Sequence, residues 1–419
     1  MPTDSESLPA QALRGVRVLD LSRVLAGPWC TQTLADLGAD VIKVERPLTG
    51  DDTRGWGPPY LKDAAGADTS EAAYYLAANR NKRSITVDLA SAEGQALVRR
   101  IAAQSDVLVE NYKVGDMARY GLDAPTMLAR NPRLVYCSIT GFGQTGPYRE
   151  RAGYDYAAQG IGGLMSVTGP SRAESADDAP GGGPQKVGVA VADLFTGMYA
   201  STAILAALRH RDRTGVGQSI DMALLDTQVA MLANLGANYL VSGVVPQRAG
   251  NAHQNVVPYQ VFEVDDGHLI LAVGNDAQFE RFCAVAGLRE LALDPRFVRN
   301  AGRVRDRAAL VPRLAQVFKT RRRADWLAAL EAAKVPCGPI NDLAEVFADP
   351  QVVQREMTVR MAHPLGAQVE LVASPMKLSA TPVQYRLPPP LLGEHTDEVL
   401  SELGLDRDEI ARLRRLGAI

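Results

Sequence analysis

The feature that most constrains the fold of this 419-residue chain is an alternation of short β-branched runs with helical patterns in its first 140 residues. Helical patterns lie near residues 30–37 and after Ser91, which is placed to cap the second of these helices. Strands linked by helices fold as right-handed βαβ units around a mostly parallel sheet with both faces covered. The predicted strands are residues 16–21, 40–44, 84–88, 107–109 and 134–138.

This α/β architecture is Rossmann-like, but the sequence does not predict a dinucleotide site. No Gly-x-Gly-x-x-Gly follows the first predicted strand, and the Gly-Ile-Gly-Gly of residues 160–163 lies far downstream with a different spacing. After about Met222 the pattern changes to a long helix, a loop and a hairpin with Asp265-Asp266-Gly267 at its turn. Helices are then predicted at residues 277–286, 307–318 and 324–334, which indicates a smaller α+β domain.

Composition and charge exclude several classes of protein. A net charge of -3 gives no electrostatic footprint for nucleic acid or a membrane surface. The N-terminal residues lack the apolar core of a signal peptide, and no uncharged apolar run reaches membrane-spanning length. We therefore expect a soluble, cytoplasmic protein. The cysteines form no Cys-x-x-Cys pair, so neither a zinc site nor a disulfide framework is predicted: Cys30, Cys137, Cys283 and Cys337.

Common local catalytic signatures such as Gly-x-Ser-x-Gly are absent from the sequence. Eight short segments instead form an ordered set along nearly the whole chain: residues 13–20 (Leu-Arg-Gly-Val-Arg-Val-Leu-Asp), 26–28 (Ala-Gly-Pro), 37–45 (Leu-Gly-Ala-Asp-Val-Ile-Lys-Val-Glu), 81–84 (Asn-Lys-Arg-Ser), 109–111 (Val-Glu-Asn), 214–218 (Thr-Gly-Val-Gly-Gln), 337–339 (Cys-Gly-Pro) and 392–396 (Leu-Gly-Glu-His-Thr). In their order and spacing these segments resemble class III CoA-transferases, the family of formyl-CoA transferase and carnitine CoA-transferase.

Asp193 is the candidate nucleophile. By its sequence position alone it is an N-cap, because Asp just before an apolar helical segment commonly accepts backbone N–H groups. Residues 191–198 (Val-Ala-Asp-Leu-Phe-Thr-Gly-Met) are similar to the family segment that carries the nucleophilic aspartate. The two roles are compatible, because a helix N-terminus favours the ionised carboxylate. The resemblance implies that Asp193 attacks an acyl-CoA thioester, holds CoA covalently and passes it to a carboxylic acid.

Coenzyme A enters this chemistry as a substrate, and the resemblance implies no permanently bound cofactor and no metal. Its phosphates need cations and backbone donors. The family resemblance assigns the CoA site to Ala26, Arg46, Val87, Leu89, Asn111, Tyr112, Lys113 and Arg119. The chain departs from the family pattern at Leu25, where formyl-CoA transferase has a polar residue, and at Ala90, which replaces a lysine.

A flap is expected around Gly250, in residues 248–255, although this stretch lacks the oligoglycine run of the family. His253 is either a flap group or a loop histidine. Tyr154 and Asp155 are expected at the acyl pocket. Asp155 also matches the general base of the related α-methylacyl-CoA racemases, which pair it with an N-terminal histidine. Here the first histidine is His210, so racemisation is disfavoured. A racemase-type isomerase and a non-catalytic CoA-binding protein remain as alternatives.

The resemblance also implies a domain order and an assembly. We expect a large CoA-binding domain over residues 1–225, a small domain with the flap over residues 226–345, and a C-terminal segment, residues 346–419, that returns to the large domain. The family forms homodimers whose two chains interlock. Residues 251–274 look closer to the succinyl-CoA:dicarboxylate branch than to the oxalate branch, so succinyl-CoA is the expected donor and a carboxylic acid the acceptor.

Overall fold

The structure is a computed structural model that describes residues 10–171 and 175–419. These residues form two compact units. The first contains the described residues up to Leu164, together with Gly188–Ala237 and Gln351–Ile419. The second contains the described residues of Met165–Val187 together with Asn238–Pro350. The domain boundaries expected at residues 225 and 345 stay a prediction.

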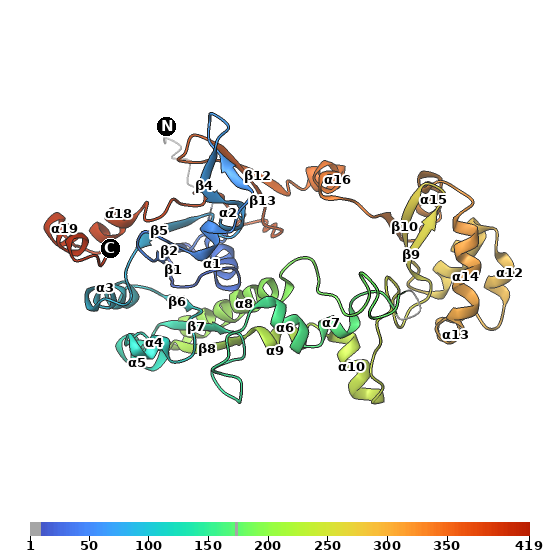
Figure 1. Ribbon diagram of the computed structural model, residues 1–419, viewed down its shortest axis with the longest axis horizontal. Coiled ribbons are helices and arrows are strands. Elements are labelled where there is room, and N and C mark those ends of the chain that lie inside the picture. The colour runs from blue at the N-terminus through green and yellow to red at the C-terminus, as the bar shows by residue number, and fades with distance from the viewer. Residues whose placement is uncertain (1–9, 172–174) are drawn as a thin grey trace, which may run out of the picture. The chain divides into compact units, whose positions relative to one another are not determined.

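The first unit is built on a six-stranded parallel sheet with the order β5-β2-β1-β6-β7-β8 (Figure 1). Numbered among themselves, these strands run 3-2-1-4-5-6, the order of Rossmann folds. The predicted α/β class is thus confirmed, and five strands lie close to the predicted positions. The strands are β1 (Arg17–Asp20), β2 (Asp40–Glu45), β5 (Lys82–Thr86), β6 (Val107–Glu110), β7 (Val135–Thr140) and β8 (Gln218–Ala223).

Helices cover both faces of this sheet because neighbouring residues on each strand point to opposite sides. Val18 packs in one apolar cluster with helices α1 (Ala26–Asp36), α8 (Val191–Thr214) and α9 (Leu224–Ala230). Leu19 packs in the other, whose helices are α3 (Ala92–Ala103), α4 (Asp116–Arg119), α5 (Ala124–Arg130), α18 (Thr396–Glu402) and α19 (Arg407–Arg415). The C-terminal helices therefore complete the core of the first unit.

The observed start of α3 matches the sequence prediction, whereas that of α1 differs from it. Ser91 caps α3 as predicted, since its Oγ accepts the Gly94 N–H at 2.9 Å. The helix predicted near residues 30–37 begins earlier, since α1 starts at Ala26 and includes Pro28. A proline in the first helical turn loses no hydrogen bond, since those N–H groups have no partner within the helix.

Shorter elements decorate the first unit. They are η1 (Asp52–Gly55), the antiparallel pair β3 (Tyr60–Lys62) and β4 (Asp68–Ala72), α2 (Ala73–Leu76), α6 (Asp155–Ile161), and a second antiparallel pair, β12 (Thr358–Ala362) and β13 (Gln368–Val372). Four short helices lie at or near the joints between the units: α7 (Leu164–Val167), α10 (Ala233–Ser242), α16 (Leu343–Ala348) and α17 (Pro350–Gln354).

The second unit combines a three-stranded antiparallel sheet with helices. The predicted hairpin is confirmed, with β9 (Tyr259–Val264) and β10 (Gly267–Ala272) joined at Asp265 and Asp266. Phe318 stacks on Phe262 and Phe282 in an aromatic core. The other elements are β11 (Cys337–Pro339), α11 (Asp276–Ala286), α12 (Arg289–Leu293), α13 (Asn300–Arg305), α14 (Arg307–Phe318) and α15 (Arg323–Ala332).

Among the described residues, α8 alone is long and apolar enough to cross a membrane by length and composition. In this fold α8 packs on α1, α9, β7 and β8. Its first turn carries Asp193, and its last turn carries Arg211 and Arg213. One side of α8 therefore belongs to the core of the first unit, whereas Phe195, Met198 and Tyr199 on the same helix are exposed.

Candidate active site

A cleft of about 460 Å³ opens in the first unit where the strand order reverses, between β1 and β6. Open parallel sheets bind ligands beyond the carboxyl ends of their strands at such a point. The cleft is lined by residues 23–26, which follow β1, and by residues 111–114, which follow β6. Asp193 and Tyr154 also line it. The cleft thus brings together six of the predicted site residues: Ala26, Asn111, Tyr112, Lys113, Tyr154 and Asp193.

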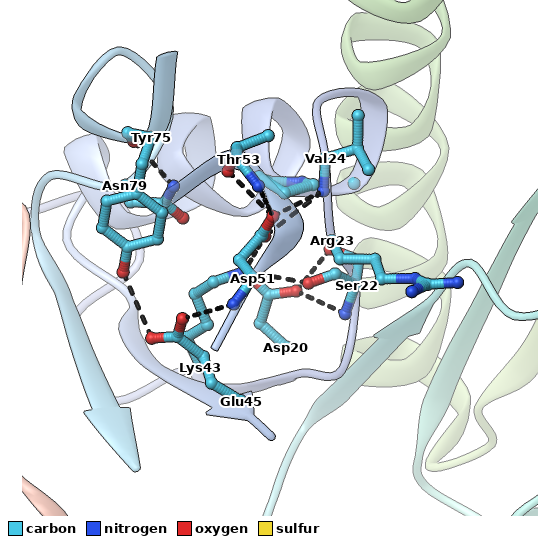
Figure 2. A network of polar contacts seen from close by, with 12 residues as sticks. Asp20, Ser22, Arg23, Val24, Lys43, Glu45, Asp51, Thr53, Tyr75 and Asn79 are labelled. Atoms are coloured by element: carbon cyan, nitrogen blue, oxygen red, sulfur yellow. Dashed lines mark hydrogen bonds and ion pairs between the residues drawn. The ribbon is translucent and has the colours of Figure 1, made fainter. Parts of the chain in front are cut away.

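The loop after β1 is held at three successive residues, and Figure 2 shows the contacts of two of them, Ser22 and Val24. Buried Lys43 donates from Nζ to the Ser22 carbonyl at 2.9 Å. Asn111 binds the Arg23 backbone twice, accepting its N–H at 3.0 Å and donating to its carbonyl at 2.7 Å. The Asp51 carboxylate accepts the Val24 N–H at 3.2 Å. Together these bonds fix the backbone that forms one wall of the cleft.

Val24 in this loop has a φ of +70°, which is unusual for a β-branched residue. Such backbone strain persists only where the surroundings over-determine it, and it clusters at functional sites. Asp51 supplies that constraint, and Lys43 binds it at 3.0 Å. Burial alone would raise the pKa of Asp51, but Lys43 and the hydrogen bonds from Thr53 lower it to about 2. The loop is therefore anchored by a carboxylate that stays ionised.

Asp193 is the third residue of α8 and does not cap it, so the N-cap interpretation is wrong. The N-cap position is Ala190, which contributes no side-chain bond. The carboxylate of Asp155 takes this role: Oδ1 accepts the N–H groups of Ala192 at 2.8 Å and Asp193 at 3.4 Å. The Asp193 side chain, which makes no cap hydrogen bond, is left facing the cleft.

A helix N-terminus by itself favours an ionised carboxylate, but the surroundings of Asp193 favour its protonated form. Burial, and then the negative charge of Asp155, raise the pKa of Asp193 to about 7. Burial, and then the negative charges of Asp193, Asp155 and Asp51, raise the pKa of nearby Tyr74 to about 12. A partly desolvated carboxylate is weakly solvated when ionised, and this makes it a better nucleophile than one in water.

Four cationic side chains line the cleft: Arg23, Lys113, Arg149 and Arg151. Besides Asp193, the acidic residue in the lining is Asp52, which pairs with Arg23 at 2.9 Å. This excess of positive charge suits an anionic substrate, and guanidinium groups suit phosphates and carboxylates. Within the described residues no group of three His, Cys, Asp or Glu side chains is placed to hold a metal ion.

Arg46 lies at a second cavity of about 240 Å³ that shares Arg23 and Tyr112 with the cleft. Asp52 joins the two arginines, since its other oxygen pairs with Arg46 at 2.6 Å. Arg119 lines neither cavity and pairs with Asp116 at 2.5 Å. Two cations, Arg23 and Arg46, are thus held side by side beyond the carboxyl ends of β1 and β2.

The remaining predicted residues lie elsewhere. Val87 and Leu89 belong to the apolar core beneath the sheet and do not line the cleft. Asp155 lies behind the cleft wall, with its second oxygen bound to Gln159 at 2.7 Å. Gly250 and His253 belong to the second unit, where the His253 ring packs edge-on to Tyr259. The His253 Nδ1 accepts the Asn255 N–H at 3.0 Å, as in an ordered loop.

Sequence reasoning missed four residues that line the cleft: Arg23, Trp56, Arg149 and Arg151. None belongs to a periodic pattern. The three arginines share one signal, their position after a strand. Arg23 follows β1, and Arg149 and Arg151 lie in the loop after β7. Listing the charged residues after each predicted strand would have found all three arginines.

Comparison with known proteins defines the family. The chain belongs to CoA-transferase family III, whose model matches residues 13–396. It is accordingly an enzyme, a CoA-transferase, and the predicted family is confirmed. A succinate–glutarate CoA-transferase of Agrobacterium fabrum is 52% identical over 391 residues, which cover 93% of this chain and 95% of that protein.

Two further relatives agree with this assignment. A human succinyl-CoA:glutarate CoA-transferase is 42% identical over 408 residues, covering 97% of this chain and 90% of the human protein. The crystal structure of a CaiB/BaiF family protein from Brucella suis superposes with a TM-score of 0.80 at 50% identity, covering 94% of this chain and 99% of that one. Both the sequence and the fold therefore match this family over almost the full length.

Proposed function

We propose that this CoA-transferase moves CoA from succinyl-CoA to a dicarboxylic acid such as glutarate, through covalent intermediates on Asp193. The single observation that carries the proposal is the position of Asp193, whose half-buried carboxylate lies in a cation-lined cleft at the switch point of the sheet. The names of the relatives support the choice of succinyl-CoA and a dicarboxylate.

In the first half of the reaction, an Asp193 oxygen attacks the thioester carbon and the C–S bond breaks. CoA leaves as a thiolate, and a mixed anhydride joins the succinyl group to Asp193. The thiolate then attacks the Asp193 carbonyl carbon of this anhydride. Succinate leaves, and CoA remains on Asp193 as a thioester. The energy of the thioester is thus retained without a nucleotide triphosphate.

The second half repeats these steps in reverse. The acceptor carboxylate attacks the Asp193 thioester, and the thiolate leaves. That thiolate attacks the acceptor carbonyl of the second anhydride, which yields the new acyl-CoA and frees the Asp193 carboxylate. Each tetrahedral intermediate is negatively charged, so cationic side chains around the cleft lower its energy.

For binding, we propose that Arg23 and Arg46, bridged by Asp52, hold phosphate groups of CoA, with Asn111, Tyr112 and Lys113 along the same wall. Arg119 stays a proposal for the outer end of the nucleotide site. A flap at Gly250 and His253 is proposed to close over the intermediate. A cytoplasmic location and an interlocked homodimer are also proposals, and light scattering on the purified protein tests the dimer.

No observation favours the racemase alternative. Both carboxylate oxygens of Asp155 are engaged, one by the start of α8 and one by Gln159, and this residue does not line the cleft. No histidine lines the cleft either, within the part of the chain that the structure describes. The non-catalytic alternative is set aside because the chain is a CoA-transferase.

The test is to incubate the protein with succinyl-CoA and examine the Asp193 peptide by mass spectrometry, after trapping acyl adducts with hydroxylamine. We expect an adduct on Asp193 and a loss of transfer of more than about a thousandfold in Asp193→Asn. Asp226→Asn is the matched control, because Asp226 is the third residue of α9 and lies outside the cleft lining. Undiminished transfer by Asp193→Asn would refute the proposal.

A further inference from the structure

The loop between β7 and α6 is closed at its base by two glycines. A Cβ on Gly141 would lie 2.5 Å from the Cα of Gly153, and a Cβ on Gly153 would lie 2.4 Å from the Cα of Gly141. The Gly141 carbonyl accepts the Leu225 N–H at 3.1 Å, which ties this base to the start of α9. The two ends of the loop of residues 142–152 therefore meet at one fixed point beside β7.

Aromatic contacts orient Arg151 within this loop. Its guanidinium lies 3.9 Å from the centroid of the Tyr148 ring, and the backbone N–H of Arg151 donates to the Tyr148 carbonyl at 2.9 Å. Tyr148 in turn packs edge-on against Phe142, with ring centroids 5.7 Å apart. A guanidinium stacked in this way keeps its in-plane N–H donors free for other partners. Arg151 is thus a pre-oriented donor.

Arg151 also differs from the other two arginines of the cleft in charge pairing. Arg23 pairs with Asp52 at 2.9 Å, and Arg149 pairs with Glu150 at 3.3 Å. Across residues 10–171 and 175–419, Arg151 has no carboxylate within ion-pair distance, although it lines the same cleft as Asp193. A cation without a partner in a cleft that handles carboxylic acids is placed to receive a carboxylate from the substrate.

We propose that Arg151 determines dicarboxylate specificity by binding the distal carboxylate of the acyl group while its other end reacts at Asp193. This inference rests on the proposed function and adds the residue that would read the second carboxylate. A guanidinium binds a carboxylate through two parallel N–H···O bonds, whereas a terminal amide of the same size offers one acceptor oxygen and no negative charge. The other anion that could occupy this position is a phosphate of CoA, and that source predicts a different result.

The experiment lets glutarate and glutaramate, in which an uncharged amide replaces one carboxylate, compete for the same enzyme–CoA intermediate, so the ratio of their products is independent of the donor. The wild-type enzyme is expected to prefer glutarate. Arg151→Gln should reduce that preference by about tenfold to a hundredfold, the loss typical of hydrogen bonds to a charged group. The CoA dissociation constant should stay unchanged. Arg130→Gln, which removes an exposed cation of α5 outside the cleft lining, should preserve the ratio.

The competition assay distinguishes a substrate carboxylate at Arg151 from a CoA phosphate there. An equal loss with both acceptors and weaker CoA binding would assign Arg151 to a phosphate and overturn the inference. An unchanged ratio in Arg151→Gln, or a wild-type ratio near one, would also overturn it. Arg151→Lys, which keeps the charge but loses the fork, should retain part of the preference. Absence of an Asp193 adduct in the wild-type protein would instead overturn the proposed function.

Discussion

The Asp155 carboxylate binds the backbone N–H of Asp193 at 3.4 Å, and its negative charge helps to raise the pKa of the Asp193 side chain. Asp155 therefore caps the first turn of α8 and also disfavours ionisation of the Asp193 carboxylate in that turn. Asp155 is a positioning residue in this arrangement, since it acts on Asp193 and not on the cleft itself.

The pH dependence of transfer should follow Asp193. Only its ionised form attacks, so kcat/KM should rise with pH up to about 7, the pKa of this carboxyl, and then level off. Asp155→Asn keeps an oxygen acceptor for α8 but removes the charge, so the acid limb should move to lower pH. The shift should be partial, because burial is the larger cause and remains. A rate profile between about pH 5 and 9 tests this, and an unmoved limb in Asp155→Asn would contradict it.

The same pKa predicts a stability difference between the wild-type protein and Asp193→Asn. The folded-state pKa of about 7 lies above the ordinary value of 3.8, so the folded protein binds the extra proton between these values. Wild-type stability relative to Asp193→Asn should therefore fall as pH rises through this window and stay constant above it. Tm values of both proteins at pH 5 and pH 8 measure the effect. A difference that is equal at the two pH values would show that Asp193 is not perturbed.

Lys43→Met should remove the anchor of the loop after β1. Lys43 and Asp51 are fully buried, and loss of one partner leaves an uncompensated charge that costs about 3 to 5 kcal/mol. Because the Ser22 and Val24 backbone loses its support, KM for acyl-CoA should also rise. Denaturant unfolding and steady-state kinetics measure both effects.

Lys62→Met is the control for this substitution, because Lys62 pairs with Asp68 on the surface, where such pairs contribute about 0 to 1 kcal/mol. If the two variants lost equal stability, the buried network would not be the anchor described here.

Gly197→Ala should separate the helix that carries Asp193 from the cleft wall. A Cβ at residue 197 would lie 2.7 Å from the Ala26 carbonyl oxygen and 3.2 Å from the Trp29 Cβ, so α8 must move away from α1. Overpacking of this kind costs about 1 to 3 kcal/mol, and a displaced Asp193 should lower kcat more than it raises KM. Gly338→Ala, where a Cβ meets nothing within 4 Å, is the control. Normal turnover in Gly197→Ala would mean that the close contact of the two helices is not needed.

Much of the sheet could be predicted because buried parallel strands are short runs of β-branched residues, as in residues 107–109. The sixth strand, β8, was missed because half of its residues are polar and half are exposed. The pairs β3–β4 and β12–β13 were missed for a related reason, since short strands with exposed faces lack a continuous apolar signal.

The candidate site was predictable where it follows strand ends, and less so where tertiary contacts decide. The family resemblance pointed to Asn111 and Asp193, and both line the cleft. It did not indicate that Asp155, 38 residues earlier, would cap the helix of Asp193, because capping across such a distance leaves no local pattern. Arg151 was missed for the same reason, since its orientation depends on Tyr148 and Phe142.

The meeting of Gly141 and Gly153 closes the base of the loop of residues 142–152, and near its start Gln144 binds Ser138 of β7 and Asp221 of β8. Because the two ends of this loop lie at one point, exchanging or lengthening residues 145–152, beyond Gln144, should leave the strands and α8 undisturbed. New acyl preferences can then arise by altering one short segment while the machinery that forms the thioester stays intact. This loop segment is therefore the one to alter in order to engineer a preference for a different carboxylic acid.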